Sequence, residues 1–272
     1  MYHPPILRYS TTPSLQLVLA LNLDFDLHVH TFHSPCGRAE MLPGEIVRTA
    51  GKRGIARLGL TDHLYTFTDP GIFEQTRAAV KHAIGGIRGR PEVFFGCEVE
   101  VMAPGRVAGG PELAERLDFV MAGATHFQNV GITDLPPRRD DLSIAQYYVR
   151  MFEYAVSIPW VDILAHPFFI VPEVCPTTIL DLISDADLRP GIELAGENDV
   201  AMEISRRVFS PGQLEFSTRF YRLCKEAGLK FTLGSDAHCL ADVGNVGILA
   251  PVISELGLTE KDFWFPQAKE GE

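Results

Sequence analysis

The stretch DFDLHVHTFHSPCG, Asp24 to Gly37, places three histidines, two aspartates and a cysteine within fourteen residues. It follows an apolar run, and the two together predict a β-strand over Leu23–Val29. Because side chains alternate across a strand, His28 and His30 point to the same face. Two imidazoles aimed at one point are costly in an apolar core unless a group binds both, and a metal ion does this well. The stretch therefore predicts a strand that delivers two ligands to a metal ion.

The composition predicts one globular domain in a reducing compartment. The chain has 272 residues, of which 46% are hydrophobic, and barrels of this length commonly form a single core. Lys and Arg total 24 and Asp and Glu total 35, so the formal charge is −11, which disfavours general nucleic-acid binding. The five cysteines are odd in number and include no CxxC pair. This pattern argues against a disulfide framework and favours a cytoplasmic protein.

The N-terminal residues do not have the pattern of a targeting or membrane segment. No apolar run approaches the roughly 20 residues of a membrane span, so we expect no membrane partner. The apolar segment at residues 15–23, LQLVLALNL, follows a single arginine, Arg8, and continues into Asp24 without a small-residue cleavage site. We therefore expect residues 1–22 to be an N-terminal extension and residues 23–272 to be one domain.

Short apolar, β-branched runs alternate with longer helical patterns along the chain. The predicted strands are Leu23–Val29, Ile55–Thr61, Glu92–Val99, Asp118–Thr125, Val161–Ala165, Gly191–Leu194 and Lys230–Gly234. The predicted helices between them are Pro43–Lys52, Gly71–Ile87, Ser143–Ser157 and Leu214–Ala227. Such alternation favours an α/β fold with parallel strands inside and helices outside. Seven strands predict a distorted (β/α)7 TIM-like barrel rather than an eight-fold one.

The predicted strands end in residue types that bind metals. These residues are His28, His30, His63, Glu98, His126, His166, Asp236 and His238. In a parallel barrel the carboxyl ends of the strands converge on a single mouth, where the chemistry of such folds is found. Nitrogen and carboxylate ligands without a cysteine cluster suit Zn²⁺, Mn²⁺ or Fe²⁺. So many ligands predict a cup that holds more than one divalent ion.

The order of these motifs resembles that of the polymerase-and-histidinol-phosphatase (PHP) superfamily. The motifs are HVH at 28–30, LTDH at 60–63, Glu98, His126, AHP at 165–167 and GSDAH at 234–238, and the resemblance spans about Asp26 to Gly247. It implies a PHP-type distorted seven-stranded barrel with two to three divalent ions. It also implies a first ion on His28, His30, Glu98 and Asp236, a second on Glu98, His126 and His166, and a third on His63 and His238.

The first loop departs from the family pattern at the third ion. Family members often carry His or Asp five or six positions after the HxH pair, where this chain has Pro35 and Cys36. Cys36 could bind as a thiolate, which would favour zinc, or His33 could reach in from the same loop. In a third alternative, Cys36 is a packed loop residue and the third ion is weakly held or absent.

A cup of this kind supports hydrolysis of a phosphate ester. The ions would bind the phosphoryl oxygens, and a metal-bound hydroxide would attack phosphorus in line. Glu98 and Asp236 would hold the ions, and His238 or His63 would protonate the leaving alkoxide. The resemblance thus implies a hydrolase, a metal-dependent phosphoesterase similar to histidinol phosphatases, that acts on a small-molecule phosphate ester.

Arginines in two loops are candidates for binding the phosphate of the substrate. Arg138 and Arg139 lie in the segment QNVGITDLPPRRDDL after His126, and Arg106 lies in the short loop APGRVAGG. An arginine fork matches phosphate oxygens. The Arg-Arg-Asp-Asp run could equally be an exposed charge cluster before a helix, and the glycines near Arg106 could simply form turns.

Three other functions are compatible with the sequence. The same hydroxide could attack carbon in an amide or a cyclic ester, which would make the protein a hydrolase of a non-phosphate bond. A PHP-fold module could also be non-catalytic, although such a module should have lost metal ligands. A single-strand exonuclease is the third alternative, which the acidic charge disfavours.

Overall fold

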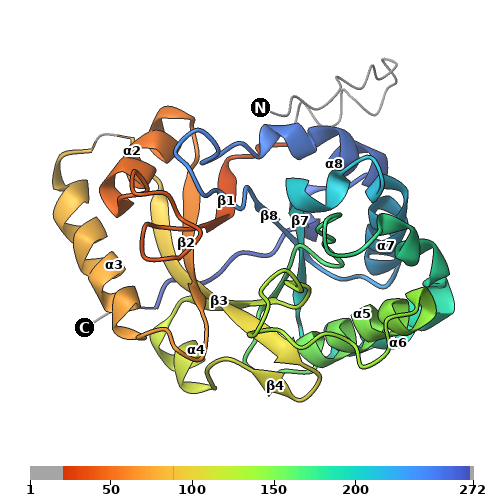
Figure 1. Ribbon diagram of the computed structural model, residues 1–272. Helices are drawn as coiled ribbons and strands as arrows, with labels where there is room; N and C mark the ends of the chain where they lie inside the picture. Colours follow the sequence, from red (N-terminus) through yellow and green to blue (C-terminus); the bar gives the residue numbers. More distant parts are fainter. Residues whose placement is uncertain (1–20, 88, 270–272) are drawn as a thin grey trace.

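The structure is a computed structural model that describes residues 21–87 and 89–269 (Figure 1). The predicted N-terminal extension, residues 1–22, therefore lies almost wholly outside the described residues. Within the described ranges, no helix is both long and apolar enough to cross a bilayer. All five cysteines of the chain are free.

The centre of the fold is a sheet of seven parallel strands in the order β1-β2-β3-β5-β6-β7-β8. The strands are β1 (Phe25–Val29), β2 (Arg57–Leu64), β3 (Glu92–Ala103), β5 (Phe119–Gly123), β6 (Ile163–Ala165), β7 (Ala201–Ser205) and β8 (Phe231–Gly234). A short antiparallel strand, β4 (Arg106–Val107), pairs with the far end of β3. Nearly all residues of the parallel strands are buried, as expected when helices cover the outside and side chains fill the inside.

The first and last strands almost close the sheet into a barrel. Val29 and Ala237 form a parallel bridge, and the backbone N–H of His30 donates to the Ala237 carbonyl at 3.1 Å. Because this contact lies just after β8, the loop that follows β8 is held beside the end of β1. Residues far apart in the sequence, at 28–30 and 234–238, therefore meet at one point of the mouth.

Helices surround this barrel (Figure 1). They are α2 (Pro43–Lys52), α3 (Gly71–Ala83), α4 (Glu112–Arg116), α5 (Asp141–Val156), α6 (Asp185–Glu197), α7 (Leu214–Glu226) and α8 (Ala250–Leu256). Short 3₁₀ helices are η1 (Ile84–Gly86), η2 (Thr177–Leu182), η3 (Arg206–Phe209), η4 (Gly247–Leu249) and η5 (Glu260–Asp262). The helix α2 begins with Pro43, as its sequence predicts, and turns Ile46, Val47 and Ala50 into the core. The helices predicted at 43–52, 71–87, 143–157 and 214–227 correspond closely to α2, α3 with η1, α5 and α7.

Aromatic residues cover the amino-terminal end of the barrel, opposite the mouth. Phe25, the first residue of β1, contacts the rings of Phe263 and Phe265 edge-on, at centroid distances of 5.2 and 4.8 Å. The N–H of Trp264 donates to the carbonyl of Phe231, the first residue of β8, at 2.8 Å. This end of the barrel is thus lined with apolar rings, whereas the predicted metal ligands lie at the other end.

The prediction of a strand at Gly191–Leu194 is wrong. That segment lies inside α6, and the strand at this place in the barrel is β7, Ala201–Ser205, which was not predicted. A capping box between Ser184 and Asp187 starts the helix, which continues through Pro190. Its apolar face follows helical spacing and is buried at Leu188, Ile192 and Ala195. Packing of this face outweighs the helix-breaking signal of the Pro-Gly pair.

Candidate metal centre

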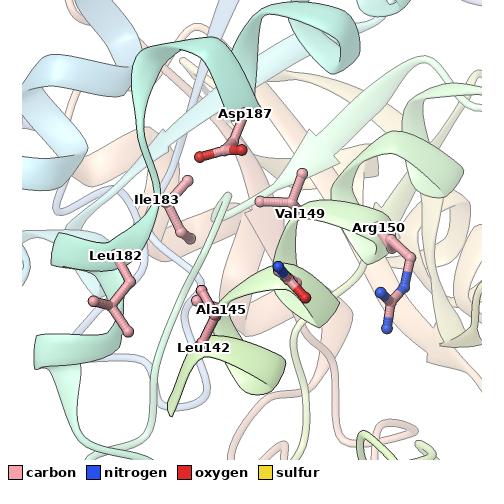
Figure 2. Close-up of a pocket in the computed structure, with 8 residues that line it drawn as sticks. Leu142, Ala145, Val149, Arg150, Leu182, Ile183 and Asp187 are labelled. Carbon is pink, nitrogen blue, oxygen red and sulfur yellow. The ribbon is translucent and has the colours of Figure 1, made fainter.

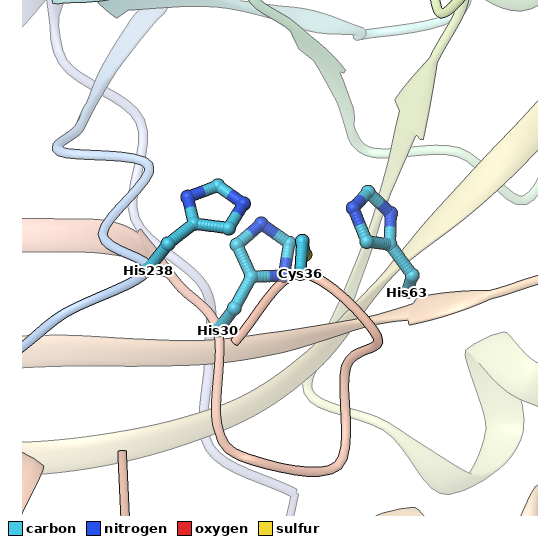
Figure 3. Close-up of side chains that lie close together, drawn as sticks. All are labelled: His30, Cys36, His63 and His238. Atoms are coloured by element: carbon cyan, nitrogen blue, oxygen red, sulfur yellow. The ribbon is translucent and has the colours of Figure 1, made fainter. Parts of the chain in front are cut away.

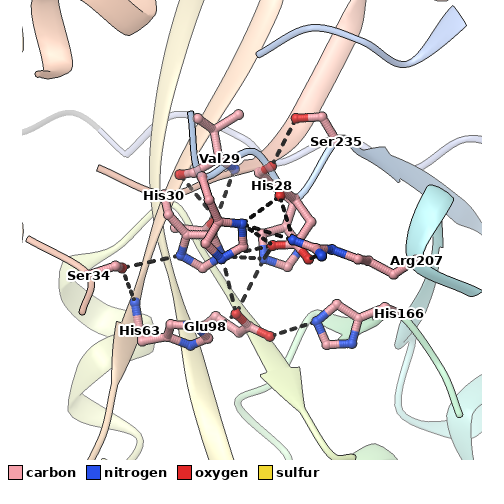
Figure 4. A network of polar contacts seen from close by, with 12 residues as sticks. His28, Val29, His30, Ser34, His63, Glu98, His166, Arg207 and Ser235 are labelled. Atoms are coloured by element: carbon pink, nitrogen blue, oxygen red, sulfur yellow. Dashed lines mark hydrogen bonds and ion pairs between the residues drawn. The ribbon is translucent and has the colours of Figure 1, made fainter. Parts of the chain in front are cut away.

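Glu98, on β3, lies at the centre of the mouth and is 1% exposed. Its Oε2 is 3.3 Å from His28 Nε2 and 3.5 Å from His30 Nε2. Its Oε1 is 3.0 Å from His166 Nε2 and 3.6 Å from His126 Nε2. One carboxylate therefore faces His28 and His30 with Oε2 and His126 and His166 with Oε1, and Oε2 also lies 3.1 Å from His63 Nδ1. Figure 4 shows His28, His30, His63 and His166 around Glu98.

The first pair of imidazoles comes from the end of β1. His28 Nε2 and His30 Nε2 are 3.0 Å apart, and His30 Nε2 is 3.1 Å from Asp236 Oδ1. Two ligand atoms that each lie about 2.0–2.1 Å from one zinc ion are separated from each other by distances of this size. The spacing of these nitrogen and oxygen atoms therefore fits ligands around one ion. The structure thus brings together His28, His30, Glu98 and Asp236, the four residues predicted for the first ion.

The second pair comes from β5 and β6. His126, just after β5, and His166, just after β6, form a ligand-distance group with Glu98. The Glu100 carboxylate lies 2.9 Å from His126 Nδ1 and accepts from Thr133 Oγ1 at 2.7 Å, so it orients this ring and leaves Nε2 toward the mouth. The buried Nδ1 of His166 has no hydrogen-bond partner among the described residues.

A third group lies at the rim and consists of His30, Cys36, His63 and His238, whose ligand atoms are within 4.8 Å of one another (Figure 3). The His30 ring stacks between those of His63 and His238, at 4.5 and 4.6 Å. His63 Nδ1 is buried and lies 3.1 Å from Glu98 Oε2. Cys36 is an exposed residue, but partial desolvation of its thiol, followed by the carboxylates of Glu98 and Asp236, raises the pKa of the thiol to about 12.

These donors fit divalent ions. Unpartnered polar atoms in a buried site are rare in folded proteins, and His166 Nδ1 is of this kind. Two of the proposed ligands also carry backbone strain, because His166 (φ 29°) and Asp236 (φ 49°) adopt left-handed conformations that non-glycine residues seldom occupy. Such strain concentrates at functional sites, where surrounding contacts hold it in place.

The titration behaviour of the cup reflects its dense packing of opposite charges. Burial alone would raise the pKa of Glu98, but His63 and His28 outweigh it and hold this pKa well below its usual range. Burial alone would lower the pKa of His28, but the carboxylates of Glu203 and Glu98 raise it well above its usual value. Bound ions would take the place of the protons on these imidazoles, since only the neutral ring is a ligand.

Comparison with known families identifies the chain. The PHP domain matches residues 26–207, more than half of the 272 residues. The chain belongs to the PHP domain family. The matched segment runs from the HxH pair to Arg207, and the last two proposed ligands of this PHP domain, Asp236 and His238, lie beyond it. The predicted membership of this family is confirmed.

Relatives and solved structures agree with this assignment. A "Probable phosphatase" from Syntrophotalea carbinolica is 26% identical over 241 residues, covering 88% of this chain and 90% of the relative. Another from Thermoanaerobacter sp. is 28% identical over 250 residues, covering 88% and 89%. Histidinol phosphate phosphatase from Lactococcus lactis, solved with zinc, L-histidinol and phosphate, superposes with a TM-score of 0.61 at 16% identity and covers 87% of this chain and 94% of that one. The predicted distorted seven-stranded PHP barrel is confirmed.

Glu203 was not identified from the sequence, although it contacts two proposed ligands. This fully buried side chain on β7 places Oε1 2.8 Å from His28 Nδ1 and accepts the backbone N–H of His166 on Oε2 at 2.6 Å. A carboxylate on the far nitrogen of a metal-bound imidazole fixes the orientation of the ring. This carboxylate lies against Gly234 on β8. A Cβ at position 234 would overlap the Glu203 carboxylate, so the position requires glycine. The alternation in AMEIS could have indicated the strand and its inward-facing glutamate.

Arg207 is the second residue that sequence reasoning missed. Its guanidinium donates to Asp236 Oδ2 at 2.5 Å and lies 3.0 Å from His238 Nδ1. The side chain is about one-third exposed, at 33%, so it borders the cup and is open to solvent on one side (Figure 4). A cation in this place is well positioned to receive a phosphoryl oxygen.

The predicted substrate-binding arginines lie farther out. The Arg138 guanidinium is 80% exposed and pairs with Asp140, which caps α5. Arg106 pairs with Asp134 at 3.2 Å, and Arg139 is exposed. Their role in binding substrate stays a prediction.

Contacts within the first loop distinguish Cys36 from His33 as the loop's ligand to the third ion. Asp62 accepts from Thr31 and from Ser34 Oγ at 2.6 and 2.8 Å, and this network fixes the loop that carries Cys36. Cys36 is part of the ligand-distance group at the rim, whereas His33 stacks on Phe32 at 4.1 Å and is not part of that group. The geometry favours Cys36.

Glu203→Gln should weaken metal binding about 10- to 100-fold, the loss typical for partners of metal-bound histidines. An amide does not supply the negative charge that polarises His28, and it can present its NH₂ to a ring that needs an acceptor. Calorimetric titration of the metal-free variant with Zn²⁺ measures the change. The control is Glu197→Gln, at an exposed position of α6. Parent-like zinc affinity in Glu203→Gln would show that Glu203 supports only the fold.

Proposed function

We propose that this PHP domain is a metal-dependent phosphatase that hydrolyses a small-molecule phosphate ester at a site of two to three divalent ions. The observation that carries the proposal is the position of Glu98, whose two oxygens face separate pairs of imidazoles. The names of the curated relatives and the phosphate in the Lactococcus structure support the same reaction class.

The proposed ligands divide the cup into three positions. The first ion is assigned to His28, His30, Glu98 and Asp236, the second to Glu98, His126 and His166, and the third to Cys36, His63 and His238. When bound, Zn²⁺, Mn²⁺ or Fe²⁺ would lower the pKa of water and offset the charge of the phosphoryl oxygens. Both are required for attack on a phosphate ester near neutral pH.

The protein's own residues position the substrate and the proton. Arg207 would donate to a phosphoryl oxygen through the part of its guanidinium that Asp236 and His238 do not occupy. In such an arrangement the ester oxygen of the leaving group faces the rim, where His238 and His63 stand. With the third position empty, either imidazole could deliver the proton to the departing alkoxide. With that position filled, both rings would be ligands, and the ion would offset the charge of the alkoxide instead. Arg106, Arg138 and Arg139 remain candidates for contacts with more distant parts of a substrate.

The reaction is tested by assaying phosphate release from a panel of phosphate monoesters, with Mn²⁺ and separately with Zn²⁺. We expect release that requires added metal and stops with a chelator. The panel should include histidinol phosphate, because the Lactococcus lactis protein was solved with L-histidinol and phosphate. Metal-loaded protein that releases phosphate from no ester, yet opens an amide or cyclic ester, would support the other hydrolase reaction.

Cys36→Ser tests the third position. Co²⁺ bound by a thiolate produces a near-ultraviolet charge-transfer band that oxygen and nitrogen ligands do not produce. We expect this band in the parent protein and its loss in Cys36→Ser, together with a fall in metal content toward two ions per chain. Cys239→Ser is the matched control, because the Cys239 thiol contacts Asp242. A band that persists in Cys36→Ser would exclude Cys36 as a ligand.

A further inference from the structure

The hydroxyl of Ser34, on the loop after β1, contacts the ring of His30. Ser34 is buried, and its Oγ donates to Asp62 Oδ1 at 2.8 Å. The same oxygen accepts the backbone N–H of His63 at 3.0 Å and lies 3.2 Å from His30 Nδ1 (Figure 4). One hydroxyl therefore joins a proposed ligand of the first ion to β2, the strand that carries a proposed ligand of the third.

The partners of this hydroxyl determine which ring nitrogen of His30 carries a proton. A serine hydroxyl has one hydrogen to donate and two lone pairs that accept. Its hydrogen is directed at the Asp62 carboxylate, and the backbone N–H of His63 can only donate to it. The remaining lone pair must therefore accept from His30 Nδ1. This nitrogen carries the proton, and the neutral ring keeps its free lone pair on Nε2.

The free lone pair of His30 is the one that faces the cup. His30 Nε2 lies 3.0 Å from His28 Nε2 and 3.1 Å from Asp236 Oδ1, and a neutral imidazole binds a metal only through an unprotonated nitrogen. We propose that Ser34 is a positioning residue that holds His30 in the tautomer able to bind the first ion and links its ring to the charge of Asp62. This inference rests on the metal centre of the proposed phosphatase function.

His30 differs from His28 in the partner of its outer nitrogen. The Glu203 carboxylate lies 2.8 Å from His28 Nδ1, whereas His30 Nδ1 faces a neutral hydroxyl. Because that hydroxyl donates to Asp62, and hydrogen bonds in such a chain polarise one another, the Ser34 oxygen is a better acceptor than an isolated hydroxyl. It is still a weaker acceptor than a carboxylate. Removal of the Ser34 hydroxyl should therefore lower metal affinity, but by less than the loss of the Glu203 charge.

Thr31 provides a matched control in the same loop. Its buried Oγ1 donates to Asp62 Oδ2 at 2.6 Å and accepts the backbone N–H of His33 at 3.2 Å. Thr31 thus ties the loop to the same carboxylate as Ser34 does, but among the described residues its hydroxyl makes no hydrogen bond to a ring nitrogen. If Ser34 only holds the loop, Ser34→Ala and Thr31→Val should have equal effects.

The first test is calorimetric titration of the metal-free variants with Zn²⁺, together with their melting temperatures. We expect Ser34→Ala to weaken one zinc-binding step about 10-fold, at the lower end of the range for partners of metal-bound histidines. Thr31→Val should bind zinc like the parent protein, although both variants should lower the melting temperature to a similar extent. Leu182→Ala gives the scatter of both measurements, because Leu182 is an exposed residue of the groove between α5 and the η2–α6 segment (Figure 2).

The second test determines the tautomer in the parent protein, without metal and without a change at Ser34. Nitrogen-15 NMR of the metal-free protein at alkaline pH, where imidazoles are neutral, should show the proton of His30 on Nδ1. The His30 signals are those missing from the spectrum of His30→Ala.

Three results would overturn the proposal and leave the metal centre intact. They are a proton on His30 Nε2, parent-like zinc binding by Ser34→Ala, and an equal loss of zinc affinity in Thr31→Val. A parent protein that binds no Zn²⁺ would overturn the metal centre and the phosphatase function, and with them the role of Ser34 in metal binding.

Discussion

Replacing Glu98 by glutamine should empty two metal positions at once and lower turnover by orders of magnitude. Two divalent cations about 3.5–4 Å apart repel each other by on the order of 15–20 kcal/mol at an effective dielectric constant of ~20. The carboxylate of Glu98 lies between the two imidazole pairs and would offset much of this repulsion. Glutamine is nearly the same size but removes the negative charge and one of the two ligand oxygens. Elemental analysis of the purified variant and its rate of phosphate release measure the two effects.

Glu100→Gln is the matched control for Glu98→Gln. Glu100 lies two residues farther along β3 than Glu98 and is as deeply buried. Its carboxylate contacts His126 Nδ1 and Thr133 rather than both imidazole pairs. Its effect should therefore be limited to the second position and be much smaller. Equal loss of metal in the two variants would mean that Glu98 does not bridge two ions.

His30→Ala is expected to cause the second large loss. The imidazole touches both Asp236 and the rings of His63 and His238, so its removal affects the first position and the rim together. A ligand about 2 Å from an ion cannot be replaced by a more distant group. The loss of turnover should exceed the roughly 10- to 100-fold range for residues that only support ligands. Single-turnover phosphate release at saturating Mn²⁺ measures it.

His33→Ala provides the comparison within the same loop. His33 is partly buried and stacks on Phe32, and it is not part of the ligand-distance groups among the described residues. Its replacement should change turnover by less than about threefold, a surface-scale effect of no more than roughly 0.5 kcal/mol. If His33→Ala loses as much activity as His30→Ala, the metal ligands of the first loop have been assigned wrongly.

Much of this architecture could be predicted because the barrel is built from local patterns. Strands such as Leu23–Val29 and Ile55–Thr61 are apolar, short and followed by clear helices, and each carries its ligand type at or near its end. Parallel topology then gathers those ends at one mouth. The HxH pair was decisive, because period-two alternation fixes the direction of both imidazoles from the sequence alone.

The missed residues depended on contacts that local patterns do not encode. The predicted strand began at Gly191, directly after Pro190, whereas a buried helical face and a capping box make this segment part of α6. That error displaced the sixth parallel strand, β7, and concealed Glu203. Arg207 belongs to the η3 turn after β7, and its contact with Asp236 spans 29 positions of the sequence. Only the assembled barrel reveals such pairs.

Hydrolysis of phosphate esters by this PHP domain should depend on several bound ions. The decisive experiment strips the protein of metal, titrates it with Zn²⁺ or Mn²⁺, and measures bound metal and phosphate-ester hydrolysis in the same samples. We predict no hydrolysis by the metal-free protein, binding of more than one ion per chain, and activity that rises only as the positions sharing Glu98 fill. Full activity of the metal-free protein, or saturation of activity with no bound metal, would contradict the account.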